Sequence, residues 1–233
     1  MKSSVIATLA SIFLIATPAV AARLPIKATP ASPNWTGFYV GGHAGYGWSR
    51  IKETSPTLPG VEISTLGHGF LGGGQFGFNW QTGPFVLGAE ADISGSTVKG
   101  DTSCPLATVD CQHNLTWLAT LRARAGALVN DDRTLIYVTG GGAWAHINYK
   151  EITRATGALY GTGLSETHSG WALGGGIEQM ILPRLSVRLE YLYVGLDRAS
   201  TPANTLSFNA VNVDSSMQTI SVGLNYRFWS PSD

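Results

Sequence analysis

Four acidic and four basic side chains lie in segments that are otherwise apolar or rich in glycine. They are Glu90, Asp92, Glu178 and Glu190, and Arg122, Arg124, Arg188 and Arg227. Groups of these types could act as general acids and bases or relay protons. They could also form buried ion pairs, in which guanidinium groups bridge carboxylates on neighbouring strands. Four matched pairs are more than catalysis requires, which favours a structural network.

The segments that position these side chains alternate between large apolar residues and small or polar ones. A period of two predicts β-strands with one apolar face. Eight segments show it, near residues 38–48, 70–80, 85–93, 117–127, 134–149, 171–178, 185–193 and 219–228. The fifth is ambiguous, because either Ile136, Val138 and Trp144 or Leu135, Tyr137 and Ala143 could face outward.

Connections between these segments alternate between long and short. The long ones span about 49–66, 98–112, 150–166 and 197–215, and the short ones lie at 82–84, 130–132 and 182–184. Long loops at one end and tight turns at the other are typical of outer-membrane barrels. We therefore predict an all-β, eight-stranded antiparallel up-and-down transmembrane β-barrel over residues 35–229.

The apolar faces should contact lipid and the small, glycine-rich and charged faces should line the lumen, the reverse of a soluble barrel. An eight-stranded barrel is just wide enough for side chains to fill it, so the eight charged residues should plug it. Glycines at 72–74, 140–142 and 174–176 should make room for the arginines. The expected membrane-interface girdle comprises Trp35, Trp48, Trp80, Trp117, Trp171, Tyr193 and Phe228.

The N-terminus has the pattern of an export signal. Lys2 precedes an apolar stretch, and Ala19-Val20-Ala21 is a small-x-small cleavage pattern, so residues 1–21 are predicted to be a signal peptide. Residues 22–34 are expected to be a flexible linker and 230–233 a C-terminal tail. A formal net charge of zero argues against nucleic-acid binding.

Cys104 and Cys111 are the two cysteines. In an exported chain a disulfide between them is the default expectation. Zinc binding together with His113 is the alternative, although three candidate ligands are few. We expect no cofactor and no resident metal.

Several motifs along the mature chain resemble a known family. Residues 34–42 read NWTGFYVGG, 137–141 read YVTGG, 188–191 read RLEY and 222–228 read VGLNYRF. These resemble the small outer-membrane β-barrel proteins of alpha-proteobacteria, the RopB-type family with surface antigens of brucellae and rhizobia. The resemblance implies an OmpA-like barrel in the outer membrane, with surface loops and no enzymatic activity. Its partners would be outer-membrane lipid, lipopolysaccharide and the barrel insertion machinery. Five residues follow Phe228, so the terminal aromatic insertion signal is ambiguous.

Three non-enzyme functions are open: a structural surface protein, a small diffusion porin, and loop-mediated capture of a ligand such as haem. Haem could use His68, His146, His168, Tyr149 or Tyr160. An unidentified extracellular ligand is also possible. The local hydrolase-like cluster is His168 with Ser169 and Glu166, but adjacent strand residues face opposite sides, which argues against an enzyme.

Overall fold

The computed structural model describes residues 33–54, 62–103, 109–153, 155–158, 164–201 and 211–229. All strands belong to the unit Ser32–Asp233. The predicted signal peptide 1–21, most of the linker 22–34 and the tail 230–233 lie outside the described residues. Among the residues described, no helix is long and apolar enough to cross a membrane.

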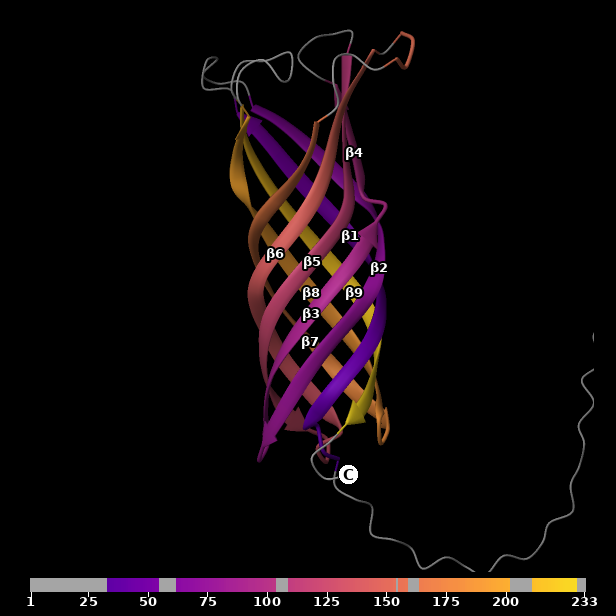
Figure 1. Cartoon of the computed structure of the whole chain (residues 1–233), viewed down its shortest axis with the longest axis vertical. Coiled ribbons are helices and arrows are strands. Elements are labelled where there is room, and N and C mark those ends of the chain that lie inside the picture. Colours follow the sequence, from indigo (N-terminus) through magenta and orange to yellow (C-terminus); the bar gives the residue numbers. More distant parts are fainter. Residues whose placement is uncertain are drawn as a thin grey trace, which may run out of the picture. The chain divides into compact units, whose positions relative to one another are not determined.

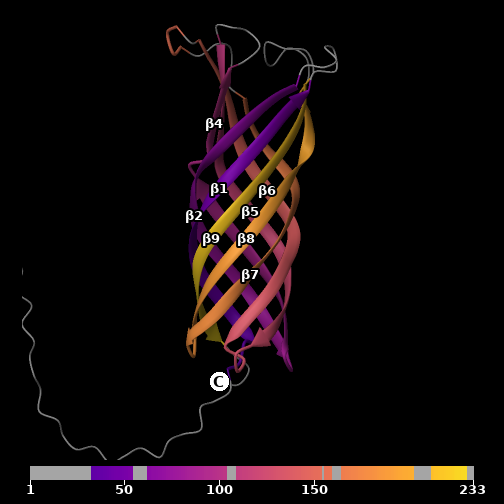
Figure 2. The same ribbon diagram turned by 180° about the vertical axis from the view of Figure 1, so that it is seen from behind.

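The described strands form one antiparallel sheet that closes on itself (Figure 1). They are β1 (Gly37–Thr54), β2 (Glu62–Thr82), β3 (Phe85–Ser96), β4 (Lys99–Ser103), β5 (Val109–Val129), β6 (Thr134–Thr153), β7 (Leu164–Leu182), β8 (Leu185–Thr201) and β9 (Val211–Trp229). β3 and β4 both pair with β2 and β5, so they are two parts of one barrel strand. β1 pairs with β2 on one side and with β9 on the other (Figure 2), which confirms an eight-stranded barrel.

The two ends of the barrel differ in their connections. Tight turns join β2 to β3, β5 to β6 and β7 to β8 at one end, called here the turn end. Gly83 has a φ of +56° in the first turn, a conformation that glycine adopts without steric cost. Asn130, Asp131 and Asp132 also have positive φ, and Asn and Asp tolerate that region better than most residues. The opposite end is called the loop end.

The strands extend further toward the loop end than the sequence predicts. Residues 49–54, 62–66, 99–103, 109–112, 150–153, 164–166, 197–201 and 211–215 are strand, so the predicted bounds of the four long connections are wrong. In these residues the strands still pair through backbone hydrogen bonds, although the sequence no longer alternates between apolar and polar residues. Outside lipid, an outward side chain can be polar while its backbone still pairs with the next strand.

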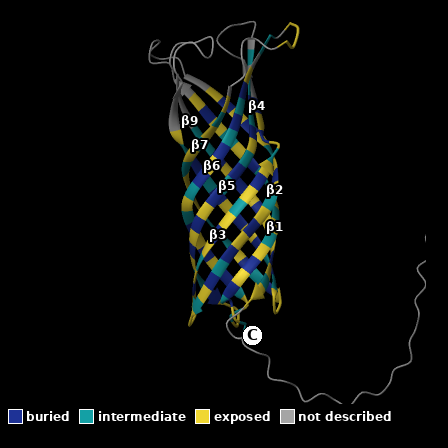
Figure 3. Cartoon of the chain, viewed as in Figure 1, coloured by how far each residue is buried: buried dark blue, intermediate teal, exposed yellow. Residues whose placement is uncertain are grey.

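Alternating burial runs along the wall strands wherever the burial of their residues is described (Figure 3). Outward positions carry large apolar side chains, such as Phe70 at 70% exposure and Val138 at 64%. Such a continuous apolar exterior is what a lipid-facing barrel wall requires. The facing of β6 is also decided: Ile136, Val138 and Trp144 point outward, while Leu135 and Ala143 are fully buried in the lumen.

The lumen is packed in three layers, two of them apolar. The turn-end cluster consists of Trp35, Val86, Leu128, Leu135, Tyr137 and Met180. The loop-side cluster consists of Leu71, Val98, Leu115, Leu118, Ala143, Ala145, Ile147, Tyr149, Ala172, Leu192, Val194 and Met217, with Leu196 packed against it. Buried charged residues lie between these clusters. The expectation of a small, glycine-rich and charged interior is therefore only partly right, because side-chain packing also admits large apolar residues.

Glycines make room for tyrosines as well as arginines. A Cβ atom on Gly77 would lie 2.3 Å from the Tyr39 hydroxyl oxygen, and one on Gly176 would lie 2.8 Å from that of Tyr137. A Cβ on Gly223 would lie 3.0 Å from Nε of Arg188. Gly176 belongs to the glycine group 174–176, which was predicted to make room for arginines. Gly223, the glycine beside Arg188, belongs to none of the three predicted groups.

Candidate functional site

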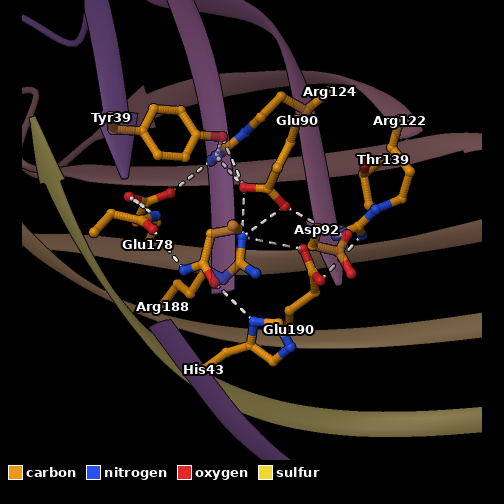
Figure 4. A network of polar contacts seen from close by, with 12 residues as sticks. Tyr39, His43, Glu90, Asp92, Arg122, Arg124, Thr139, Glu178, Arg188 and Glu190 are labelled. Atoms are coloured by element: carbon orange, nitrogen blue, oxygen red, sulfur yellow. Dashed lines mark hydrogen bonds and ion pairs between the residues drawn. The ribbon is translucent and has the colours of Figure 1, made fainter. Parts of the chain in front are cut away.

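Seven buried charged residues form the middle layer of the lumen, called here the lumenal network (Figure 4). Its members are Glu90 and Asp92 on β3, Arg122 and Arg124 on β5, Glu178 on β7, and Arg188 and Glu190 on β8. Each pair on one strand is two residues apart, so both side chains point into the barrel. The strand period therefore brings the charges of four strands to one level.

Glu90 is the centre of the lumenal network. Arg188 donates from Nη1 to both of its carboxylate oxygens, at 2.8 and 2.6 Å, and Arg122 donates from Nη2 at 2.9 Å. The Tyr39 hydroxyl donates at 2.7 Å. The Glu90 side chain is only 3% exposed. One carboxylate thus joins β1, β5 and β8 across the lumen.

Arg122 bridges three carboxylates. Besides Glu90, its Nη1 lies 3.0 Å from Glu190 and its Nη2 lies 3.0 Å from Asp92. Thr120 on the same strand donates a hydrogen bond to Asp92. Guanidinium groups suit this role because their planar, forked donors can serve several acceptors at once.

Arg124 links the lumenal network to the turn end. Its Nη2 lies 2.6 Å from Glu178, and its Nη1 donates to the Tyr39 hydroxyl oxygen at 3.0 Å. Its guanidinium carbon lies 4.2 Å from the centre of the Tyr137 ring, which adds a cation–π contact. Asn225 also donates to Glu178, at 2.8 Å.

The lumenal network has three positive and four negative members, all shielded from solvent. Burying isolated charges costs several kcal/mol per ion, and only good geometry with additional hydrogen bonds offsets that cost. Hydroxyl and amide donors supply those bonds here. Each charged member of the lumenal network has at least one opposite charge within 4 Å.

Arg227 is the eighth predicted charge, and it lies at the turn end. Its Nη2 donates to the Pro183 carbonyl oxygen at 2.9 Å, and its guanidinium carbon lies 5.7 Å from the Trp35 ring centre.

Trp35 was predicted to belong to the lipid-facing girdle, and this prediction is wrong. Its side chain is 2% exposed, and its indole nitrogen donates to the Asp132 carbonyl oxygen at 2.8 Å. The indole belongs to the turn-end cluster, where it gains both packing and a hydrogen-bond acceptor.

The other six predicted girdle residues face outward. Trp48, Trp80, Trp171 and Phe228 are exposed, and Trp117 and Tyr193 are partly exposed. They form aromatic contacts along the wall: Trp171 lies 5.4 Å from Tyr193 between ring centres, and Trp117 stacks on His146 at 5.7 Å.

Sequence reasoning missed Tyr39 and Tyr137 as members of the site. Tyr39 alternates with Phe38, so the period of two already placed it on the inner face. Tyr137 lies on the strand whose facing was ambiguous. The available signal was an inward position that combines a large ring with a hydroxyl, opposite a glycine on the next strand.

The remaining candidate sites are dispersed or lie outside the described residues. Cys104 lies outside them, so the disulfide stays a prediction. His113 is buried in the lumen and packs edge-on against Tyr149, with ring centres 5.1 Å apart. Within the described part of the chain, no group of three or more His, Cys, Asp or Glu residues could hold a metal ion.

The histidines considered for haem binding or hydrolysis lie on both sides of the wall. His168 points inward, where its Nε2 lies 3.2 Å from the Tyr149 hydroxyl, whereas Ser169 points outward and donates to Asp197 at 3.1 Å. His146 lies on the outer face beside Thr167. Tyr160 lies outside the described residues. The hydrolase-like pair is therefore separated by the barrel wall, as adjacent strand residues must be.

A closed eight-stranded antiparallel barrel with an apolar exterior is the fold of a small outer-membrane β-barrel protein. The family model for the outer membrane protein β-barrel domain matches residues 7–228, and the chain belongs to that family. The protein is located in the bacterial outer membrane. This confirms the resemblance drawn from the sequence motifs.

Curated relatives and a solved structure agree with this assignment. The chain is 34% identical to the 31 kDa outer-membrane immunogenic protein of Brucella melitensis, over 98% of this chain and 100% of that protein. It is 26% identical to the 22 kDa outer membrane protein of Rhizobium leguminosarum bv. viciae, over 89% and 83%. The outer membrane protein OprG from Pseudomonas aeruginosa shares the fold, with a TM-score of 0.55 at 14% identity, over 84% of this chain and 99% of that chain.

Proposed function

We propose that the protein is a structural barrel with a closed lumen, which presents four loop-end connections at the cell surface and contributes to envelope integrity and surface interaction. The observation that carries the proposal is the lumenal network, which crosses the interior from β3 to β8. The names of its relatives, outer-membrane immunogenic proteins, support exposure at the surface. The alternative is a small diffusion porin.

The two functions differ in what fills the lumen. A solute crossing the barrel would have to displace Arg122, Arg124 and Arg188 from their carboxylates. Eight strands leave an interior just wide enough for side chains, whereas porins that hold an aqueous channel have 16 to 18 strands. We therefore expect the barrel to seal the membrane.

Planar-bilayer recording of the purified protein tests this function. The wild-type barrel should show no sustained open-channel current. The double variant Arg122→Ser with Glu190→Ser, which removes two long side chains from the plug, should conduct, and the lipid-facing Leu121→Ala should behave as wild type. Steady conductance in the wild type would favour the porin instead.

The cellular role needs a separate measurement. A strain that lacks the protein should be more sensitive to detergent and release more vesicles, and the wild-type sequence should restore both properties. An unchanged envelope in the deletion strain would contradict a contribution to integrity.

We further propose lipopolysaccharide as a partner of the outer wall near the loop end. Arg50, Lys99 and Lys150 are exposed. Each lies next to a buried inward residue, namely Ile51, Val98 and Tyr149, so each points outward. Cations at this level match the phosphate groups of an anionic outer-leaflet lipid, and each is worth roughly 1 kcal/mol near a charged membrane surface.

The change that tests this partner is the combination Arg50→Gln, Lys99→Gln and Lys150→Gln. These substitutions should weaken binding of lipopolysaccharide to the barrel and reduce its salt dependence. Arg133→Gln, an exposed arginine at the turn end, is the matched control and should bind as wild type. Equal binding by the triple variant and the wild type would contradict lipopolysaccharide as a partner, and it would not bear on the closed lumen.

We propose the insertion machinery as a second partner, with Phe228 or Trp229 as the terminal aromatic signal that it recognises.

A further inference from the structure

A small chamber lies inside the barrel on the loop-end side of the lumenal network. Side chains from β1, β5, β6, β8 and β9 line it, together with Val98 from the connection between β3 and β4; among the others are Ile51, Leu118, Ala145, Val194 and Met217. On β5, Leu118 precedes Arg122 by four residues, and on β8, Val194 follows Glu190 by four. The lumenal network therefore lies on the turn-end side of the chamber, beyond the inward residues Thr120 and Leu192, and the loop end is the side of access.

The lining of the chamber is almost wholly apolar. Among the described residues none of those that line it is a carboxylate, a lysine or an arginine, and its polar members are His113, Ser49, Ser215 and Ser216. Apolar cavities in proteins stay dry and take up apolar molecules. A charged solute would lose its hydration here without gaining an opposite charge.

The chamber is small, but one of its walls is adaptable. Its volume is about 30 Å³, which is room for a few atoms. Met217 forms part of the wall, and a thioether side chain with three rotatable bonds can repack around a guest. The β1 backbone passes close to Met217: a Cβ atom on Gly47 would lie 2.5 Å from the Met217 methyl group. A guest must therefore be accommodated by rotation of Met217, because the β1 backbone cannot move away without breaking its ladders with β2 and β9.

We propose that this chamber is a binding site for a small uncharged apolar molecule, no larger than a single aromatic ring or a short alkyl chain. The ligand enters from the loop end and is held above the lumenal network, which blocks its passage through the barrel. The site is distinct from the outward-facing cations and does not require the barrel to conduct.

The two buried methionines provide a direct test. Met217 lies in the chamber, and Met180 belongs to the turn-end cluster on the other side of the lumenal network. We would label the methionine methyl groups with ¹³C, place the full-length barrel in lipid nanodiscs and titrate it with benzene. The Met217 resonance should shift and saturate while that of Met180 stays in place; benzoate should shift neither. Substitution of each methionine by leucine assigns the two signals.

Chamber-filling variants separate binding from partition into lipid. Ala145→Leu and Ser49→Leu fill the chamber from opposite walls and should abolish the saturable shift of Met217. Ala123→Leu, on the exposed outer face of β5, is the control and should retain it. Heat-modifiable migration in gels checks that each variant is folded. Absence of a shift in the wild type, a shift that rises without saturation, or an equal shift in a folded Ala145→Leu barrel would overturn the proposal.

Discussion

Glu90 carries more of the lumenal network than any other single side chain described here. Two guanidinium groups and a phenol donate to its carboxylate, and these donors come from three different strands. Its position on the inner face of β3 follows from simple alternation with Ala89 and Ala91, which are exposed. One inward carboxylate therefore links three strands that do not pair with one another in the sheet.

Replacement of Arg188 by alanine should destabilise the barrel strongly. Glu90 would lose its closest guanidinium partner while staying buried, and breaking a buried pair typically costs about 3 to 5 kcal/mol. The neighbouring Leu189 faces lipid at 52% exposure, so Leu189→Ala should cost less because lipid can fill the gap. Urea unfolding in lipid vesicles measures both. Arg188→Ala within about 0.5 kcal/mol of wild type would contradict a stabilising network.

The sequence predicts which charged residues point inward, because the period of two requires no knowledge of their partners. It does not predict which of these charged side chains form ion pairs with one another. Arg188 reaches Glu90 on a distant strand instead of its direct neighbour across the ladder, and that choice depends on the diameter and stagger of the closed barrel. Trp35 was assigned to lipid for a related reason: it lies just before β1, where no alternation defines a face.

β6 is the element whose facing the sequence left open. Large apolar residues occupy both of its faces near the turn end, since its inner face packs the turn-end cluster and its outer face meets lipid. Pairing with β5 decides the matter: Gly141 lies opposite the inward Arg122, so Tyr137 and Leu135 on the same face also point inward. A single strand does not contain that information, because the facing comes from its neighbour.

Placing a charge at two levels of the outer face of β6 tests where this face meets lipid. Val138→Lys puts an ammonium group against hydrocarbon and should cost about 2 to 4 kcal/mol near the middle of the bilayer. Asn148→Lys, an outward position nearer the loop end of the same strand, should be almost neutral. The free energies of unfolding in vesicles give the comparison, and equal costs at the two positions would show that the lipid boundary is misplaced.

The extent of the strands was harder to predict than their number. Eight alternating segments suffice to predict eight barrel strands, but alternation stops where the outer face leaves lipid. Lys99–Ser103 and the first residues of β5 continue the ladder with mostly polar residues, so only the pairing of the two strands shows that they belong to the wall. The irregularity between Ser96 and Lys99 further hides β4 from any pattern that assumes a continuous strand.

For the whole molecule, the alternation of turns and longer connections predicts a fixed orientation in the membrane. We expect the turn end in the periplasm and the loop end outside the cell. An epitope inserted at Gly157, in the connection from β6 to β7, should be stained by antibody on intact cells. The same epitope at Gly83, in the turn from β2 to β3, should be stained only after the outer membrane is permeabilised. Staining of the Gly83 epitope alone on intact cells would reverse the orientation.

The seam between β1 and β9 joins residues that are almost a whole chain length apart, with Phe38 opposite Trp229. No charged member of the lumenal network lies on either strand of that seam. All seven lie on β3, β5, β7 and β8, which belong to one uninterrupted arc of the sheet. Every ion pair of the network is therefore made within this arc, and none requires a residue of β1 or β9. The seam is held by its backbone ladder, and, among the residues described, its side chains contribute only neutral hydrogen bonds to the network, from Tyr39 and Asn225.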